Sequence, residues 1–276
     1  MGDEDILLYR KKNRVVTITL NRPDKMNALN MALSGRICEA FQRFNSDDDA
    51  LVAIITGAGD KAFSAGGDLT NPEELKIATG GGISLEWHHL DIWKPMIAAV
   101  NGFCMTLGWL LAQKCDIRIA AEGAKFGITA TKLNFSGSFA SEVIRVLHRA
   151  HALEIMLWGD TLISAQRAYE MGFVNRVVPQ EKLMDEAMSW AERMLYLTPT
   201  SVRNIKRMIY YGQYMAPPQA IAFANALSAG LGSMEDTAEG VKAVLDKRKP
   251  AFKKKIALHH RAVGAASAEA APSQLD

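Results

Sequence analysis

The chain has 276 residues and is 49% hydrophobic, which is enough for a large core in one domain with an appendage. A formal net charge of +2 at pH 7 gives no reason to expect a nucleic acid or an anionic membrane as partner. No apolar run in the sequence is long enough to cross a bilayer.

The N-terminal residues and the cysteines indicate the same compartment. Residues 1–5 are acidic, which is unlike a secretory signal or a transit peptide. Cys38, Cys104 and Cys115 have no metal-ligand spacing and cannot all pair with one another. We therefore expect a cytoplasmic protein with buried thiols and no bound metal.

The first half of the chain alternates apolar runs with turn signals. Residues 15–20 are β-branched at alternate positions and predict a strand, which ends at the turn signal of residues 21–24. Helical spacing of apolar residues predicts a helix over residues 31–44, and residues 51–56 predict a buried strand. Further strands are expected at residues 96–100 and 116–121 and from residue 125, and helices at residues 84–93 and 107–114.

The second half is mostly helical. Residues 164–171 predict an N-capped helix that ends at Gly172, and residues 173–179 predict a strand closed by a proline. Strand–turn–helix units followed by helices predict an α/β core with an α-helical C-terminal part. The C-terminal helices are expected at residues 181–197, 200–211, 218–229 and 235–246.

Two turns of small residues follow strand-like runs. Ala65-Gly66-Gly67 comes after the run at residues 51–56, and Asn101-Gly102 ends the run at residues 96–100. Small residues at a strand end let the backbone turn sharply and leave its N–H groups free. Two such turns side by side can direct two N–H donors at one oxygen, which is how an oxyanion hole for a thioester carbonyl is made.

Seven motifs stand in an order that resembles the enoyl-CoA hydratase/isomerase (crotonase) superfamily, over the chain up to about residue 255. They are NRPDKMNAL at 21–29, FSAGGDL at 63–69, PMIAAVNG at 95–102, CDIRIA at 115–120, AKFG at 124–127, EGVKA at 239–243 and KRKPAF at 247–252. The resemblance implies a crotonase-like ββα spiral core at residues 1–197 and a helical trimerisation region at residues 198–258. Residues 259–276 are predicted to be a disordered tail.

The resemblance also implies a ligand and an assembly. The ligand is an acyl-CoA thioester, so coenzyme A is part of the substrate and no separate cofactor is expected. The chain would form a homotrimer, or a hexamer built from two trimers. By position, the oxyanion donors are the N–H groups of Gly67 and Leu107. The substrate-binding positions carried over are Lys25, Met26, Ala28, Ala65, Gly66, Phe252 and Lys253.

The chain departs from the family where hydration needs two glutamates. The first glutamate position falls on Leu110 and the second on Ala130, and neither side chain can carry a proton. Two-glutamate hydration is therefore disfavoured, and an isomerase, a decarboxylase or a C–C lyase or hydrolase is favoured. Trp109 could line an apolar or ring-shaped acyl pocket, although a core residue needs no such role.

Other residues are candidates for moving a proton. Glu142 is the acidic residue nearest to the altered loop that follows residue 134, although a carboxylate at a helix start is also favoured by the helix dipole alone. His88 and His89 lie on the helix that borders the acyl pocket in the family, although most helix histidines are structural or solvated. The hydroxyls of Thr129 and Thr131 could orient a water or the substrate, and serines 136, 138 and 141 could bind a polar acyl group or only shape a turn.

Two functions of different classes remain. The first is an acyl-CoA-processing enzyme that stabilises a thioester enolate with Gly67 and Leu107 and uses a non-standard proton carrier. The second is a non-catalytic acyl-CoA-binding paralogue, which the apolar residues at 110 and 130 favour.

Overall fold

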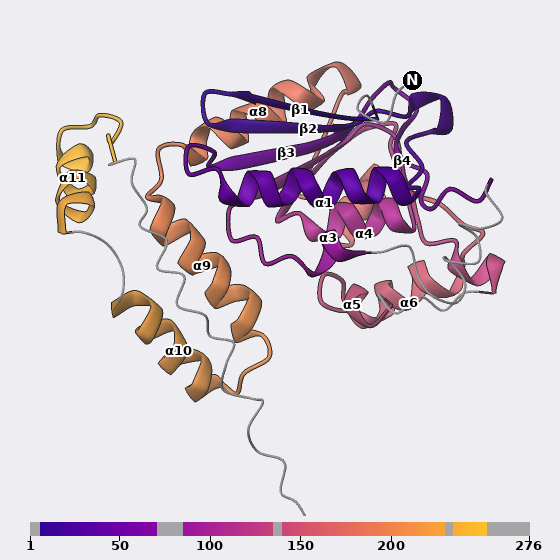
Figure 1. The fold of residues 1–276 in the computed structure, drawn as a ribbon. Helices are drawn as coiled ribbons and strands as arrows, with labels where there is room; N and C mark the ends of the chain where they lie inside the picture. Colours follow the sequence, from indigo (N-terminus) through magenta and orange to yellow (C-terminus); the bar gives the residue numbers. More distant parts are fainter. Residues whose placement is uncertain (1–5, 71–84, 135–139, 230–233, 253–276) are drawn as a thin grey trace, which may run out of the picture.

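Two sheets form the centre of the molecule. The structure, a computed structural model, describes residues 6–70, 85–134, 140–229 and 234–252 (Figure 1). The larger sheet has the order β1-β2-β3-β5-β7-β10, in which β1 is antiparallel to β2 and all other neighbours are parallel. Its strands are β1 (Leu7–Lys12), β2 (Val15–Leu20), β3 (Val52–Gly57), β5 (Met96–Val100), β7 (Ile117–Ala121) and β10 (Arg176–Val178).

The smaller sheet is made by short strands that each follow a strand of the larger one. Its order is β4-β6-β8-β9, in which β4, β6 and β8 are parallel and β9 is antiparallel to β8. The chain passes from β3 to β4, from β5 to β6 and from β7 to β8, which confirms the expected α/β class. The bounds are β4 (Ala62–Ser64), β6 (Phe103–Met105), β8 (Lys125–Gly127) and β9 (Ile163–Ser164).

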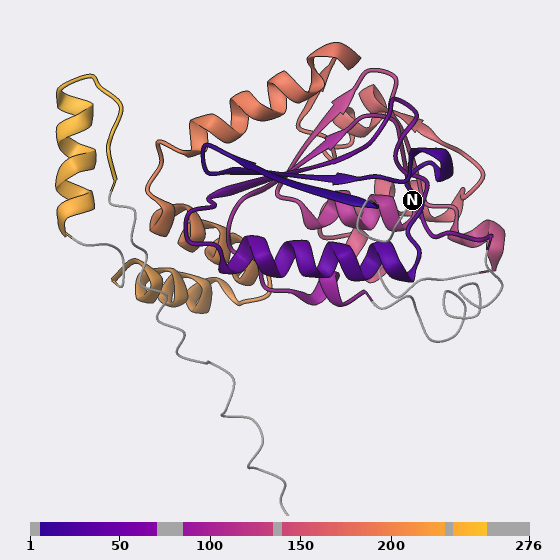
Figure 2. The ribbon, with the colours of Figure 1, turned by 45° about the horizontal axis from the view of Figure 1, so that its top comes forward.

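Helices cover both faces of the larger sheet. α8 packs its buried side chains, among them Leu183 and Ala187, against Ile54 and Ile97 of the sheet. α1 and α4 pack on the other face, and Figure 2 shows α1 and α8 on opposite sides of the strands. The helices of the core are α1 (Met31–Ser46), α3 (Glu86–His89), α4 (Leu107–Lys114), α5 (Ala140–Val143), α6 (Arg149–Leu157), α7 (Ala165–Glu170) and α8 (Leu183–Met194), with short 3-10 segments η2 (Pro23–Lys25), η4 (Ala130–Leu133) and η5 (Gln180–Lys182).

Three C-terminal helices project from the core (Figures 1 and 2). They are α9 (Pro199–Gly212), α10 (Pro217–Ala229) and α11 (Met234–Leu245), within two residues of the bounds that the sequence predicts. Asp116 attaches α9 to the core, because its carboxylate accepts hydrogen bonds from Lys206 Nζ at 2.8 Å and from the Tyr210 hydroxyl at 3.0 Å. The same carboxylate accepts the N–H of Met96 at 2.8 Å, so one side chain joins α9 to the start of β5.

Some predicted elements differ from those observed. The helix expected at residues 84–93 extends only over α3, because Leu90 is extended and Lys114 Nζ binds the carbonyls of His88 and Leu90 at 2.6 and 2.7 Å. The strand expected at residues 173–179 is shorter, because the N–H of Phe173 bonds back to the Ala168 carbonyl at the end of α7. β1, β4 and β6 were not predicted: β1 has the polar composition of an edge strand, and the other two have three residues each.

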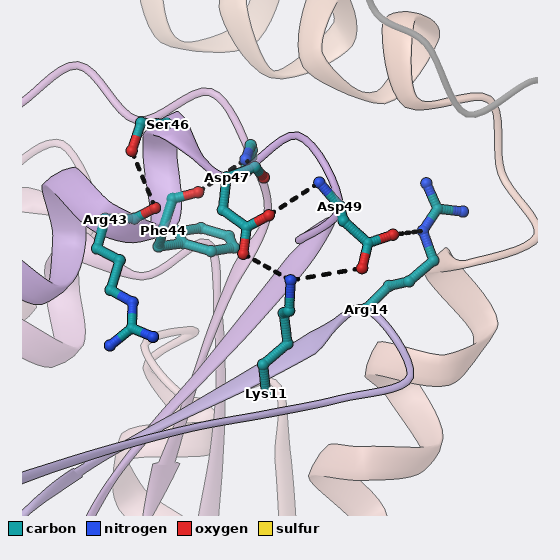
Figure 3. A network of polar contacts seen from close by, with 8 residues as sticks. Lys11, Arg14, Arg43, Phe44, Ser46, Asp47 and Asp49 are labelled. Carbon is teal, nitrogen blue, oxygen red and sulfur yellow. Dashed lines mark hydrogen bonds and ion pairs between the residues drawn. The ribbon is translucent and has the colours of Figure 1, made fainter.

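A buried lysine closes the C-terminal end of α1. Lys94 is 2% exposed, and its ammonium donates to the carbonyls of Phe44 at 2.7 Å and Asp47 at 2.6 Å. Figure 3 shows the surrounding ion pairs, in which Lys11 reaches Asp47 at 2.8 Å and Asp49 at 3.4 Å. The helix end is therefore held by cations bound to its last carbonyls and to the loop that follows.

We predict that Lys94→Met lowers the free energy of unfolding at pH 7 by about 1–3 kcal/mol, because two carbonyls lose their donor. Burial lowers the pKa of Lys94 to about 8, whereas an unfolded lysine titrates near about 10.4. Between these two values the unfolded chain binds more protons, so a rise in pH stabilises the folded protein through this group. Urea unfolding at pH 7 and about pH 9.5 measures the free energy of unfolding of the wild type and of Lys94→Met. The difference between the two proteins should be larger at the higher pH, and a constant difference would contradict the lowered pKa of Lys94.

Candidate functional site

Three loops meet at one edge of the smaller sheet. β4, β6 and β8 are parallel neighbours, with Ser64 opposite Cys104 and Met105 opposite Gly127. The carboxyl ends of parallel strands lie at the same edge of a sheet, so the loops that begin at residues 65, 106 and 128 lie together. The loop at residue 65 is the predicted Ala65-Gly66-Gly67 turn, and the loop at residue 128 contains the second vacant carboxylate position. The loop at residue 106 leads into α4, so the prediction that Asn101-Gly102 forms the second turn of the site is wrong, because that turn joins β5 to the start of β6.

The first two loops are in van der Waals contact. Gly66 has a φ of +100°, and a Cβ atom built there would lie 3.1 Å from the Met105 carbonyl oxygen and 3.4 Å from the Thr106 Cβ. A Cβ atom on Gly108 would lie 2.5 Å from the carbonyl oxygen of Ser64. Glycine at both positions therefore lets the backbones of the two turns approach each other more closely than side chains would permit.

The N–H groups of Gly67 and Leu107 have no acceptor among the described residues. Their neighbours are bonded: the Asp68 N–H donates to the Leu29 carbonyl at 2.8 Å, and the Leu110 N–H donates to the Thr106 carbonyl at 3.0 Å. Leu107 is the first residue of α4, where no carbonyl of the same helix can accept its N–H. The positive end of the helix dipole lies at the same place, so the two turns offer a site for an oxyanion.

The motif at residues 21–29 supports the first turn. Asn27 is fully buried with a φ of 53°, and its amide donates to the carbonyls of Ala58 at 3.0 Å and Ala62 at 2.7 Å. The N–H of Ala65 donates to the Met26 carbonyl at 3.0 Å. Of the predicted ligand-binding residues in this region, Ala28 and Gly66 are buried, Met26 and Ala65 are half-buried, and Lys25 is exposed.

Asp68 holds the chain after the first turn. Its carboxylate binds Arg22 at 2.9 Å and accepts the hydroxyl of Thr70 at 2.6 Å and the N–H of Thr70 at 3.1 Å. Burial acts to raise the pKa of Asp68, but the hydrogen bonds from Thr70 and Arg22 outweigh it and lower the pKa below its usual value. These contacts fit a supporting role for Asp68.

The side chains at the two vacant glutamate positions are buried and apolar. Leu110 is 0% exposed and Ala130 is 3% exposed, and both belong to the main hydrophobic core. Trp109 lies in the same core, stacked on Phe173 with ring centroids 3.8 Å apart and edge-on to Phe126. Leu107 is half-buried, with its side chain packed against this core.

The structure brings His88 and Glu142 together although they are 54 residues apart. His88 Nε2 lies 2.8 Å from a Glu142 carboxylate oxygen. Burial lowers the pKa of His88 below its usual value, although the Glu142 carboxylate acts in the opposite direction. The imidazole is therefore neutral near pH 7, and because Nε2 faces a carboxylate we assign the proton to Nε2 and the lone pair to Nδ1.

His88 and Glu142 line a cavity of about 430 Å³ between the core and α9, a volume within the roughly 300–1,000 Å³ usual for ligand pockets. His89, Gln113 and Lys114 line it as well. Gln113 follows Leu107 by six positions on α4, which is about 9 Å along a helix axis, and its side chain donates to the Glu142 carbonyl. The His88–Glu142 pair therefore packs against the C-terminal end of α4, whereas Leu107 begins this helix.

The remaining candidates occupy separate places. Phe252 is half-buried and lies near Gly240 of α11, where a built Cβ would approach its ring to 3.7 Å. Thr131 is exposed and Thr129 is half-buried. Lys253, Ser136 and Ser138 lie outside the described residues. The sequence interpretation gave Thr106 no role. A threonine where the family usually has glycine was a feature of the sequence that could have indicated one.

The fold and the site together define a class of protein: a ββα spiral that presents two backbone N–H donors at one sheet edge. A family model described as Enoyl-CoA hydratase/isomerase matches residues 10–255. The chain belongs to the enoyl-CoA hydratase/isomerase family, whose substrates are CoA thioesters.

Relatives and solved structures agree with this family. (E)-benzylidenesuccinyl-CoA hydratase of Thauera aromatica is 36% identical over 249 residues, which cover 87% of this chain and 96% of that protein. 2,3-dehydroadipyl-CoA hydratase of Escherichia coli (strain K12) is 32% identical over 252 residues, which cover 90% and 98%. The crystal structure of enoyl-CoA hydratase from Bacillus anthracis superposes with a TM-score of 0.84 at 31% identity and covers 91% of this chain and all of that one.

Neither metal-ligand clusters nor membrane-spanning helices are found within the described ranges. No group of three or more histidine, cysteine, aspartate or glutamate side chains there could hold a metal ion. None of the helices described is long and apolar enough to cross a membrane.

We predict that Gly66→Ala lowers the free energy of unfolding by about 1–3 kcal/mol, because alanine is strained at this φ and its Cβ would press on the Met105 carbonyl. Gly35→Ala in α1 is the matched control, because a Cβ there meets nothing within 4 Å and the change should stabilise the helix by about 0.5–1 kcal/mol. Urea unfolding of both variants measures the difference. Equal stability of the two variants would show that the turns are not in close contact.

Proposed function

We propose that this chain is an acyl-CoA-processing enzyme that stabilises a thioester enolate between the backbone N–H groups of Gly67 and Leu107. The observation that carries the proposal is that these two N–H groups lie on contacting turns and have no acceptor among the described residues. Fixed donors in a site sheltered from water each lower the barrier by about 2.7–4 kcal/mol.

Coenzyme A enters as part of the substrate. We assign its binding to the turn that carries Lys25 and Met26 and to the C-terminal segment that carries Phe252 and Lys253. The bond from the Ala65 N–H to the Met26 carbonyl supports this assignment, because it fixes the first turn beside the proposed oxyanion site. The proposed ligand-binding residues are Lys25, Met26, Ala28, Ala65, Gly66, Trp109, Leu110, Ala130, Phe252 and Lys253.

The reaction is proposed to be an isomerisation, a decarboxylation or a C–C bond cleavage rather than hydration by two glutamates. Leu110 and Ala130 support this choice, because neither can hold a water or carry its proton. The relatives described above are named as hydratases of acyl-CoA compounds, which supports an acyl-CoA substrate.

The proposed proton carrier is the His88–Glu142 pair. The neutral imidazole takes up a proton at Nδ1, which is buried and has no hydrogen-bond partner among the described residues, and the Glu142 carboxylate at Nε2 orients the ring and stabilises the imidazolium that forms. The pair contacts the C-terminal end of α4, through Gln113 and Lys114, whereas Leu107 begins this helix, so we assign the pair to a carbon farther along the acyl chain than the α carbon.

The alternative function is a non-catalytic acyl-CoA-binding paralogue. Full burial of Leu110 and near-full burial of Ala130 favour it, because these positions then act only as core. The free N–H groups are compatible with both functions, since binding a thioester carbonyl also uses them.

We expect His88→Ala and Glu142→Gln each to lower kcat by about 10²–10⁴ on the best substrate found in a panel of acyl-CoA thioesters. His89→Ala is tested as well, because His89 lines the same cavity, and His148→Ala is the control, because His148 is exposed and lies outside that lining. Steady-state kinetics on the full chain measure the effect. Unchanged turnover in His88→Ala and Glu142→Gln would exclude the proposed carriers, and tight binding of a thioester with no turnover of any would support the paralogue.

The chain is proposed to form a homotrimer, alone or paired into a hexamer, through the region at residues 198–258. Apolar side chains on α9 and α11 support this, because Ile205, Ile209, Val244 and Leu245 are more than half exposed in the single chain. The cysteines are buried and free, which supports the proposed cytoplasmic location, and cell fractionation tests that location.

We predict that Val244→Asp converts the assembly into monomers, because a charge on the covered face would have to be desolvated. Lys242→Asp, at an exposed position on the opposite face of the same helix, should leave the assembly unchanged. Sedimentation equilibrium measures the mass of each variant. A monomeric wild-type chain would contradict the proposed trimer.

A further inference from the structure

A pair of threonine hydroxyls lies beside the oxyanion donor of Leu107. Thr106 and Thr129 come from the loops that follow β6 and β8, and their Oγ1 atoms are 3.0 Å apart. The N–H of Thr129 also donates to Thr106 Oγ1 at 3.1 Å. The Thr106 N–H donates to the Gly127 carbonyl at 2.9 Å, so Thr106 is bound to the neighbouring loop through both its backbone and its side chain.

Counting hydrogens shows that this pair keeps one donor unused. Two hydroxyls carry two O–H hydrogens, and the bond between them uses one. Neither hydroxyl donates to another described residue, so one O–H remains available whichever threonine donates. If Thr106 Oγ1 accepts both the N–H and the O–H of Thr129, its two lone pairs are used and its own hydrogen points away from Thr129.

The backbone of Thr106 is strained. Its φ is 42° and its ψ is −97°, which is a rare conformation for a β-branched residue and costs on the order of 1–3 kcal/mol. Glycine would adopt this conformation without that cost. A threonine at this position is therefore explained by its hydroxyl rather than by its backbone.

The available hydroxyl lies in the right place to reach a bound ligand. Thr106 directly precedes Leu107, and its Cβ lies against the turn at Gly66. Thr106, Leu107, Gly67 and Thr129 are all half-buried, whereas Gly66 and Gly108 between them are buried. The two hydroxyls and the two free N–H groups therefore belong to half-buried residues on adjoining loops.

We propose that the Thr106 hydroxyl is a third hydrogen-bond donor to the thioester oxygen and that Thr129 is the positioning residue that directs it. This proposal rests on the proposed function, because it needs the thioester oxygen to bind at Gly67 and Leu107. The hydroxyl donates a hydrogen bond and transfers no proton, since its pKa is far above neutral pH. The hydrogen bonds that hold Thr106 to Gly127 and Thr129 also fix the peptide plane that carries the Leu107 N–H.

The test measures carbonyl polarisation as well as rate. A conjugated dienoyl-CoA thioester absorbs at longer wavelength when donors bind its carbonyl oxygen, and this shift needs no turnover. Thr106→Val should lose a large part of the shift and about 10²-fold in kcat, which is the effect of removing one oxyanion donor. Thr106→Ser keeps the hydroxyl and should retain both. Thr129→Val should give a smaller loss, because the Thr106 hydroxyl remains but is no longer directed.

Two further variants separate a catalytic role from a structural one. Thr106→Gly removes the hydroxyl and relieves the positive φ, so it should fold even if Thr106→Val does not, and it should also lose the shift. Thr237→Val is the control at an exposed threonine of α11, and it should behave as wild type. Circular dichroism checks that each variant is folded.

The outcomes distinguish this proposal from the proposed function. If the wild type shifts the dienoyl-CoA spectrum and Thr106→Val and Thr106→Gly shift it equally, the third donor is excluded and the oxyanion site stands. If the wild type binds no thioester or binds dienoyl-CoA without a shift, the proposed function fails and the third donor fails with it.

Discussion

The close contact between two turns is the constraint on which the rest of the site depends. A side chain at Gly108 would collide with the Ser64 carbonyl, and one at Gly66 would press on the Met105 carbonyl. This contact can form only where parallel strands β4 and β6 end side by side. Asn101 helps to align the strands, because its side chain forms hydrogen bonds with the backbones of Gly57 and Gly59. These bonds hold the connection from β5 to β6 against the end of β3.

Two lysines, buried Lys94 and half-buried Lys114, fix helix ends by binding backbone carbonyls rather than carboxylates. Lys94 closes α1 in this way, and Lys114 holds the carbonyls of His88 and Leu90 at the end of α3. Burial lowers the pKa of Lys114 to about 8, so its charge is retained at neutral pH only at a cost. The hydrogen bonds from Lys114 orient α3, and this orientation places His88 against Glu142.

The sequence predicts local features well and pairings across loops poorly. Motif order indicated the family, and strand–turn–helix units indicated the α/β class. Glycines indicated the turn at residues 65–67, whereas the second turn was expected at Asn101-Gly102 and lies at residues 106–108. β1 was not predicted, because a charged edge strand has no apolar alternation. The contacts His88–Glu142 and Thr106–Thr129 could not be predicted either, since one joins α3 to α5 and the other joins the loops after β6 and β8, which are far apart in the sequence.

Replacing two carboxylates by core residues separates two tasks that glutamates perform together. A carboxylate both holds a polar group and moves a proton, whereas a hydroxyl or a backbone N–H only holds it. Gly67, Leu107 and the threonine pair offer groups that only hold a polar atom at the proposed oxyanion site. His88, the proposed proton carrier, lies with Glu142 against the C-terminal end of α4. Under the proposed function, charge develops at the thioester oxygen while the proton moves at a more distant carbon, or no proton moves at all.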